Sequence, residues 1–119
     1  MSTVVKPRQG EIWVVQFDPA IGDEIGRVRP AIVLSNQQVG LLELRFVCPL
    51  TDWKERYDHF LWVAKLDANS TNGLLKRSGA DTFQCKSLSL ERFHHRVGKL
   101  KSEELSDVIA RLNFCLRIL

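Results

Sequence analysis

The sequence contains little cysteine and no long apolar run, and each shortage excludes a class of protein. Its three cysteines are an odd number without Cys-x-x-Cys spacing, which argues against both a disulfide framework and a zinc site. Because Cys48, Cys85 and Cys115 all lie among apolar residues, we expect buried, reduced thiols. No segment approaches the roughly 18 apolar residues of a membrane span, so no membrane association is expected. Residues 1–10 lack the apolar stretch of a signal peptide, which favours a cytoplasmic location.

Histidine and paired acids are also scarce, which bears on the type of chemistry. His59 stands alone, and His94 and His95 are adjacent rather than spaced as in a His-Glu-x-x-His zinc motif. No two acidic residues have the arrangement of a two-metal nuclease. We therefore expect neither a metal nor another cofactor. The net charge of +3 and the pI near 8.9 fit a nucleic-acid partner, but they fit an ordinary soluble protein equally well.

What the sequence does contain is a series of short segments with strand character. The 119 residues are 45% hydrophobic, which is enough for the core of one domain spanning residues 1–119. Residues 11–17 are rich in β-branched and aromatic side chains, and an Asp-Pro step ends this segment. Turn-like or charged stretches follow at residues 36–40, 52–58 and 67–73. We expect further strands at residues 31–35, 44–50, 60–66 and 80–88.

Two later segments favour helix. Ser89 is expected to cap a short helix that runs through Arg96. Ser102 is expected to cap a longer one, whose first turn carries Glu103 and Glu104, where acids complement the helix dipole. Several short strands followed by a terminal amphipathic helix indicate a mainly β fold, a small barrel with a helix packed on it. The apolar residues that recur at helical spacing in the longer helix are Leu105, Val108, Ile109, Leu112, Leu116 and Leu119.

The segment at residues 20–29 reads as a loop that collects charge between two hydrophobic strands. Pro30 favours an extended backbone at Arg29, which stands where the loop re-enters the sheet. A guanidinium fixed in this way is suited to binding a phosphate. The alternative is a solvated hairpin loop without a chemical role. The charged residues of the segment are Asp23, Glu24, Arg27 and Arg29.

Two other places carry polar side chains at expected strand positions. Thr51 ends the apolar run of residues 46–50, and its hydroxyl either contacts a ligand or bonds its own backbone. Gln84 and Lys86 would share one face of a strand at residues 80–88. That face is either a solvated surface or part of a groove for RNA.

Several blocks of the sequence, in their order and spacing, resemble the MazF/PemK toxins. The match runs from Arg8 to the last residue, and its first block is the most specific. The matching blocks are residues 8–13 (Arg-Gln-Gly-Glu-Ile-Trp), 17–19 (Phe-Asp-Pro), 22–24 (Gly-Asp-Glu), 29–36 (Arg-Pro-Ala-Ile-Val-Leu-Ser-Asn), 48–51 (Cys-Pro-Leu-Thr), 84–88 (Gln-Cys-Lys-Ser-Leu), 90–93 (Leu-Glu-Arg-Phe) and 98–100 (Gly-Lys-Leu).

The resemblance implies an SH3-like barrel of the kind that the MazF/PemK toxins share with CcdB. It implies a homodimer that binds single-stranded RNA, chiefly mRNA, along the dimer interface and cleaves it sequence-selectively without a metal. A cognate antitoxin would occupy the same groove, and operator DNA would be bound only by the complex with the antitoxin. The family's catalytic Arg and Thr correspond to Arg29 and Thr51, and Glu24 matches a loop acid implicated in activity.

The sequence departs from the family pattern in two places. Phe83 stands where many members have an acid, although Asp81 is near. Residues 52–60 are not common to all members, and the rings of Trp53 and Tyr57 either stack on bases or cover the end of the barrel. The side chains for which we expect RNA contacts are Asp23, Arg27, Trp53, Gln84, Lys86 and Ser87.

In such a reaction the 2′-hydroxyl of RNA is the nucleophile, and the products are a 2′,3′-cyclic phosphate and a 5′-hydroxyl. We expect Arg29 to stabilise the charge on phosphate first and to transfer a proton second. Thr51 would bond a phosphate oxygen or orient the 2′-hydroxyl, and Glu24 would act as the base or orient Arg29. Two alternatives are a CcdB-like topoisomerase poison and a non-catalytic SH3-like nucleic-acid-binding domain. Residues 115–119 do not resemble the Trp-Gly-Ile tail expected of the first, and the joint presence of the three candidate residues argues against the second.

Overall fold

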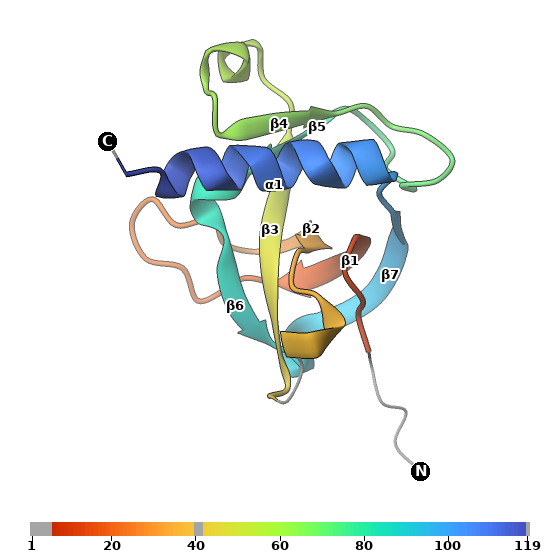
Figure 1. Cartoon of the computed structure of the whole chain (residues 1–119). Helices are drawn as coiled ribbons and strands as arrows, with labels where there is room; N and C mark the ends of the chain where they lie inside the picture. The colour runs from red at the N-terminus through yellow and green to blue at the C-terminus, as the bar shows by residue number, and fades with distance from the viewer. Residues whose placement is uncertain (1–5, 40–41, 119) are drawn as a thin grey trace.

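A computed structural model describes residues 6–39 and 42–118 (Figure 1). Within these residues the chain forms seven antiparallel strands and one α-helix, which confirms the expected mainly β fold with a C-terminal helix. No helix in these two ranges is long and apolar enough to cross a membrane. The strands are β1 (Glu11–Gln16), β2 (Val28–Val33), β3 (Leu44–Asp52), β4 (Val63–Leu66), β5 (Ser78–Asp81), β6 (Lys86–Ser89) and β7 (Phe93–Lys99), and the helix is α1 (Ser102–Leu116).

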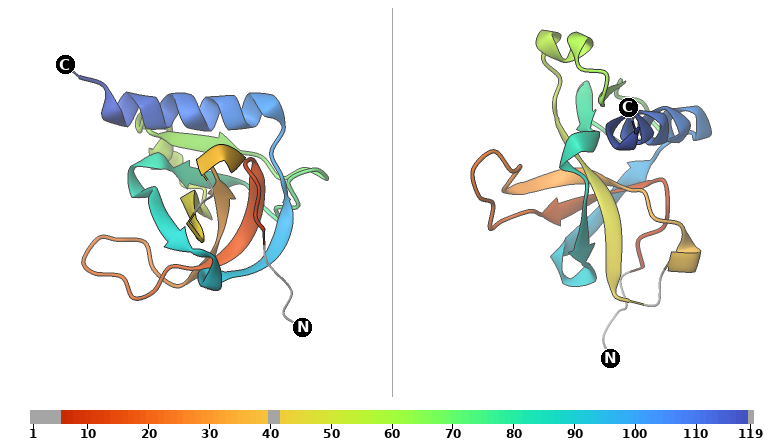
Figure 2. Two further views of the ribbon diagram at one scale, coloured as in Figure 1. Left: turned by 60° about the horizontal axis from the view of Figure 1, so that its bottom comes forward. Right: turned by 60° about the vertical axis from the view of Figure 1, so that its left-hand side comes forward.

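The long strand β3 joins the two parts of the sheet. Its first part pairs with β2 and β6, whereas residues 50–52 pair with β5. Hydrogen-bonded neighbours follow the order β4-β5-β3-β2-β1-β7, so strands from opposite ends of the sequence meet where β1 pairs with β7. The sheet curls around the core, and α1 lies across one side of it (Figure 2).

Strands β2 and β3, which carry Arg29 and Thr51, extend further than predicted at the ends where these two residues lie. β2 begins three residues earlier than predicted, because Val28 and Arg29 pair with Gln16 and Val15 of β1. β3 continues two residues further than predicted, because Thr51 pairs with Gly79 of β5. Both candidates therefore lie within the sheet, where backbone pairing fixes their positions.

The single strand predicted at residues 80–88 is wrong, because a 3-10 turn, η3 (Thr82–Gln84), divides it. β5 ends at Asp81, whose carboxylate accepts the backbone N–H of Phe83 at 3.1 Å. The Thr82 hydroxyl donates to the carbonyl of Trp62 at 2.6 Å and holds the turn against the residues that precede β4. Gln84 therefore lies in a turn rather than on a strand face shared with Lys86.

The short helix predicted at residues 89–96 is also wrong. Ser89 does act as a cap, but of a 3-10 turn, η4 (Leu90–Arg92), where its hydroxyl accepts the N–H of Glu91 at 3.2 Å. The chain then continues as β7, because pairing with β1 satisfies the backbone of this segment. His94 and His95 consequently lie in a strand, where both are exposed and the pairing with β1 shifts register.

Helix α1 lies where the apolar repeat predicts it, but it begins differently. Ser102 is the first helical residue rather than the cap, and the Glu104 carboxylate accepts the backbone N–H of Lys101 at 2.8 Å. Val108 is fully buried, and the helix packs against β4 and η3. Leu119, the last residue of the predicted repeat, lies outside the described residues.

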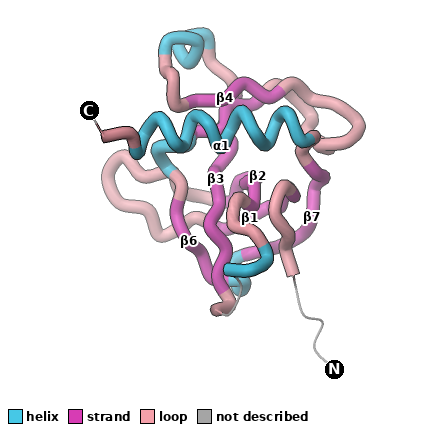
Figure 3. The backbone as a smooth tube through the Cα atoms, viewed as in Figure 1, coloured by secondary structure: helices cyan, strands magenta, loops and turns pink. Residues whose placement is uncertain are grey.

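Short 3-10 turns account for the remaining differences from expectation (Figure 3). The predicted turn at residues 36–40 contains η1 (Gln37–Val39), while Gly40 lies outside the described residues. The charged stretch after β3 contains η2 (Glu55–His59). The strand predicted at residues 60–66 is confined to its last four residues, because the chain is still leaving η2 at Phe60, whose N–H donates to the carbonyl of Tyr57.

The core has two parts. One packs beneath α1, and the other is formed by strands and their connections without the helix and includes Val15, Phe17 and Phe93. The three cysteines are free, as expected, but only Cys48 is buried, so the expectation of three buried thiols is wrong. Cys85 and Cys115 are half-buried because each lines a surface cavity. Burial raises the pKa of the Cys48 thiol well above its ordinary value. The fully buried apolar residues of the core include Ile12, Ile32, Ala64 and Val108.

Candidate active site

The loop between β1 and β2 is tied to the rest of the molecule by Gln84. The side-chain amide Nε2 of Gln84 donates to the carbonyl of Asp23 at 3.0 Å, and its Oε1 accepts the N–H of Ile25 at 3.2 Å. At the end of the loop Arg27 has a positive φ of 68°, and its carbonyl accepts the N–H of Phe17 at 2.8 Å. The loop projects from the sheet (Figure 2), but these bonds give it a defined path.

Arg29 is held by its strand and by the loop that precedes it. It pairs with Val15 in β1, and its side chain is half-buried. Its Nε donates to the carbonyl of Gly26 at 2.9 Å. Gly26 has no room for a side chain, because a Cβ there would lie 2.5 Å from Oδ1 of Asp18. The bond to Gly26 engages Nε rather than the terminal Nη1 and Nη2 groups, which suit a forked contact with phosphate oxygens.

Thr51 contacts a second hydroxyl from the segment that follows β3. Its Oγ1 lies 3.5 Å from the phenolic oxygen of Tyr57 and 3.4 Å from the carbonyl of Asp52. The Tyr57 ring packs over Gly79, the strand partner of Thr51, where a Cβ would come within 3.1 Å of the ring. The hydrogen bond from the Thr51 hydroxyl to a nearby backbone carbonyl, which the sequence offered as one alternative, is therefore long. The hydroxyl also faces Tyr57.

Arg29 and Thr51 line one cavity of about 350 Å³, together with Asp52, Lys54 and Tyr57. Arg29 and Lys54 make the cavity positively charged, which suits an anion such as a phosphate group. The carboxylate of Asp52 is paired with Lys76, with 3.0 Å between Oδ2 and Nζ. Sequence reasoning missed Asp52 and Lys54, although both follow Thr51 within three residues. Asp52 ends β3, and Lys54 directly precedes η2.

Glu24 does not line the cavity that contains Arg29 and Thr51. Its carboxylate accepts the N–H of Ile21 at 2.8 Å within the loop. It lines another cavity, of about 250 Å³, with Gln84 and Lys86 among its other residues. Gln84 and Lys86 are thus brought together as predicted, although by a turn rather than by a shared strand face. The loop carbonyl of Gly26, not the Glu24 carboxylate, holds the Nε–H of Arg29.

Trp53 belongs to an aromatic cluster beside the cavity. Its ring meets that of Tyr57 edge-on at 5.5 Å between centroids, and the ammonium of Lys65 lies 4.8 Å from the Trp53 ring. The cluster continues through Phe60 to Trp62, whose rings stack at 4.8 Å. Trp53 is half-buried, so it both packs on its neighbours and presents part of its ring to solvent.

The other predicted RNA contacts lie at the surface. Asp23, Arg27 and Ser87 are exposed, and Lys86 is half-buried at the start of β6. The carbonyl of Asp23 is the acceptor for Gln84, and Asp23 itself is exposed. Among the described residues, no three His, Cys, Asp or Glu side chains are grouped so that they could hold a metal ion.

Comparisons with known proteins agree on one family. Residues 8–116 match the family described as PemK-like, MazF-like toxin of type II toxin-antitoxin system. The chain is 32% identical over 107 residues to endoribonuclease MazF9 of Mycobacterium tuberculosis, which covers 85% of this chain and 88% of that protein. It resembles the crystal structure of MazF from Deinococcus radiodurans with a TM-score of 0.78 and 26% identity, over 92% of this chain and 96% of that one. A crystal structure of MazE-MazF from the same organism matches with a TM-score of 0.68 and 25% identity, over 92% and 95%. The predicted barrel type is thereby confirmed.

Proposed function

The chain belongs to the PemK-like, MazF-like toxin family of type II toxin–antitoxin systems, and from this premise we propose that it is an endoribonuclease whose reaction takes place in the cavity of Arg29 and Thr51. The substrate is single-stranded RNA, chiefly mRNA, cut at selected sequences without a metal ion. A single toxin domain spans residues 1–119.

One observation carries the assignment of the reaction to this cavity. A guanidinium, an ammonium and two hydroxyls converge there, from Arg29, Lys54, Thr51 and Tyr57. Positioned donors are the groups that stabilise the additional negative charge on phosphorus in the transition state. They are supplied by two paired strands and the turn η2, so they are in place before RNA binds.

The reaction is an in-line transfer within the RNA itself. The 2′-oxygen attacks the adjacent phosphorus, the new bond closes a 2′,3′-cyclic phosphate, and the bond from phosphorus to the 5′-oxygen breaks. The proton of the 2′-hydroxyl goes to a base, and the leaving 5′-oxygen takes up a proton to become a hydroxyl. Because DNA lacks the 2′-hydroxyl, it is not a substrate.

Arg29 binds the scissile phosphate and stabilises its charge, and its role in proton transfer is secondary. Thr51 bonds a phosphate oxygen or orients the 2′-hydroxyl, supported by Tyr57. Glu24 is our candidate for the base. Because its carboxylate lines the neighbouring cavity, this role requires RNA binding to draw the β1–β2 loop toward Thr51.

Further contacts to RNA come from the surface on either side of this cavity. The active form is a homodimer that binds RNA along the interface between its subunits, and it is located in the cytoplasm. A cognate antitoxin protein occupies the same groove and inhibits, and operator DNA is bound only by the toxin–antitoxin complex. The residues that we assign to RNA contact are Asp23, Arg27, Trp53, Gln84, Lys86 and Ser87.

Cleavage of a single-stranded RNA in EDTA tests the proposal. The purified protein should cut the RNA and leave 2′,3′-cyclic phosphate and 5′-hydroxyl ends, and Arg29→Ala should lower the rate by about a hundredfold or more. Arg111→Ala is the matched control, because Arg111 is paired with Asp107 within helix α1, outside the cavity. Undiminished cutting by Arg29→Ala, or no cutting by the unmodified protein, would contradict the proposal. A topoisomerase poison and an inert binding domain both predict the second result.

A further inference from the structure

A cavity of about 420 Å³ adjoins the one that holds Arg29, because Thr51 and Asp52 line both. Its volume lies within the range of roughly 300–1,000 Å³ that is usual for small-ligand pockets. Unlike its positively charged neighbour, it is lined chiefly by apolar side chains. Besides the two shared residues it is lined by Val14, Pro30, Leu50, Gly73, Leu74, Leu75, Lys76, Ser78, His95 and Val97.

One side of this cavity is formed by three neighbouring strands, β2, β1 and β7. Val14 of β1 lies opposite Pro30 of β2 on one side and opposite His95 of β7 on the other. Side chains that face each other across paired strands point to the same face of a sheet. These three residues therefore make a continuous surface that begins one residue from Arg29.

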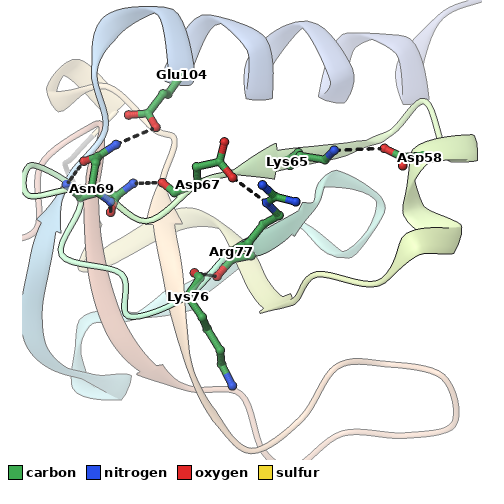
Figure 4. A network of polar contacts seen from close by, with 9 residues as sticks. Asp58, Lys65, Asp67, Asn69, Lys76, Arg77 and Glu104 are labelled. Carbon is green, nitrogen blue, oxygen red and sulfur yellow. Dashed lines mark hydrogen bonds and ion pairs between the residues drawn. The ribbon is translucent and has the colours of Figure 1, made fainter.

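The opposite side is the loop between β4 and β5, which is rigidly built. The buried side chain of Asn72 accepts the N–H groups of Asn69 and Leu74 at 3.1 and 3.0 Å and donates to the carbonyl of Asp67 at 2.9 Å. The carboxylate of Asp67 is paired with Arg77 at 2.6 Å, and the Asn69 side chain reaches Glu104 of α1 at 3.5 Å (Figure 4).

The same loop is also docked on β7. The carbonyl of Thr71 accepts the N–H of Lys99 at 3.0 Å. Gly73 has a φ of 69° and lies so close to Val97 that a Cβ would come 2.3 Å from the Val97 carbonyl oxygen. The loop is thus fixed in place at several points, yet it holds Leu75 98% exposed to water at the edge of the cavity.

We propose that this cavity binds the base of a nucleotide directly attached to the scissile phosphate, with Leu75 and His95 contacting the base from opposite walls. This inference rests on the proposed function. The shared residues Thr51 and Asp52 make the cavity adjoin the phosphate site, and a planar base linked by a charged backbone matches an apolar cavity beside a cationic one. The ion pair of Asp52 and Lys76 supplies an acceptor and a donor for the edge of the base.

An abasic substitution in RNA tests the contact directly. The cleavage site is first mapped by sequencing the 5′ ends of cut RNA. A non-cleavable oligonucleotide with a 2′-deoxyribose at that site is then made with the intact base and with an abasic residue next to the scissile phosphate. The affinity of each is measured for the unmodified protein, for Leu75→Ser and for His95→Ala. Ile118→Ser is the matched control, because Ile118 is 95% exposed and lies beyond α1.

The unmodified protein and Ile118→Ser should lose about five- to tenfold in affinity when the base is removed. Leu75→Ser and His95→Ala should lose clearly less, because they no longer contact the base, and their cleavage should be less selective at that one position. If both variants lose as much as the unmodified protein and keep its cleavage selectivity, the inference is wrong and the cavity serves another partner. That result is distinct from failure of the proposed function, in which the parent all-ribose RNA is not cut at all or is cut without Arg29.

Discussion

The hydroxyl oxygen of Thr51 lies 3.5 Å from the phenolic oxygen of Tyr57, inside the cavity that Arg29 also lines. The two residues come from different kinds of structure, since Thr51 is in β3 and Tyr57 is in η2. Tyr57 reaches the strand because Gly79, the partner of Thr51, leaves room for its ring. The orientation of the Thr51 hydroxyl therefore depends on a segment that is not part of the sheet.

Substitutions of Thr51 and Tyr57 should distinguish a residue that contacts the reacting phosphate from one that orients it. We expect Thr51→Val to lower the rate of RNA cleavage about a hundredfold, because it removes a donor to the reacting phosphate. Tyr57→Phe should lower it only about five- to tenfold, because it removes the partner that orients that donor. Single-turnover cleavage at saturating protein measures both rates, and circular dichroism checks the fold. A larger effect from Tyr57→Phe than from Thr51→Val would reverse the assignment.

The two hydrogen bonds by which Gln84 holds the β1–β2 loop lead to a second prediction. Gln84→Ala removes the acceptor for the Ile25 N–H and the donor to Asp23. We expect hydrogen exchange at Ile25 to become about tenfold faster and the free energy of unfolding to fall by only about 1 kcal/mol. RNA cleavage should fall several-fold because Glu24 lies between the two anchored residues. Gln38→Ala, at an exposed position in η1, should change none of the three measurements; unaltered exchange in the Gln84 variant would show that the loop is held by other means.

The carboxylate of Glu11 predicts a pH dependence of stability. Burial by itself raises the pKa of Glu11, but bonds from the Trp13 indole N–H and the Arg8 backbone N–H, together with the Arg96 guanidinium, outweigh it and lower the pKa below its ordinary 4.5. Because its pKa is lower in the folded state, ionised Glu11 stabilises the fold at pH values above the pKa of the unfolded state. This stabilisation is lost as the pH falls through the pKa of the folded state.

Urea unfolding of Glu11→Gln at pH 7 and pH 3 measures this contribution. The variant should be less stable than the unmodified protein at pH 7, and the difference should shrink towards pH 3, as the carboxylate takes up a proton in the unfolded state and then in the folded state. Glu43→Gln, at an exposed position, is the control and should shift stability by less than about 0.5 kcal/mol at either pH. A difference that is constant or grows on acidification would contradict the assigned sign.

Gly98 predicts a large loss of stability from a single methyl group. A Cβ at this buried position of β7 would lie 2.4 Å from the backbone carbon and oxygen of Asn72, atoms that cannot move aside cheaply. We expect Gly98→Ala to cost about 3 kcal/mol and to lower Tm by roughly 10–20 °C. Gly22→Ala is the comparison, because its φ of 59° is strained for alanine but a Cβ there meets no atom within 4 Å. Its cost should stay near 1 kcal/mol. Equal losses would mean that backbone conformation, not crowding, sets the effect.

Much of the fold was predictable, because strands and the last helix leave strong local patterns. β1 carries β-branched and aromatic residues in a short run, and α1 carries an apolar repeat after two acids. The errors came where tertiary contacts override local preference. The backbone of residues 93–96 is a strand because β1 is available as a partner, and residues 82–84 leave the strand because Thr82 bonds the carbonyl of Trp62.

The site was predictable in part for the same reason. Arg29 and Thr51 stand beside strand boundaries in the sequence, so their presence at one end of the sheet followed from the order of strands. The separation of Glu24 from them did not follow, because it depends on a bond from Gln84 that spans 59 residues of sequence to Ile25. Asp52 was missed because the end of β3 is set by pairing with β5, which no local signal records. Lys54 was missed because it enters the cavity from the position before η2, a turn that was not predicted.

The proposed base-binding cavity forms only when Val14 of β1 has paired with His95 of β7. These residues are separated by most of the described chain, and pairings between segments so distant in sequence slow folding, because closing the long intervening loop costs entropy. The pocket between them therefore exists only in molecules whose two end segments have already met. An oligonucleotide seated there binds no partly folded form of the chain. Its binding should therefore slow global unfolding, so the lifetime of the native toxin lengthens as substrate accumulates.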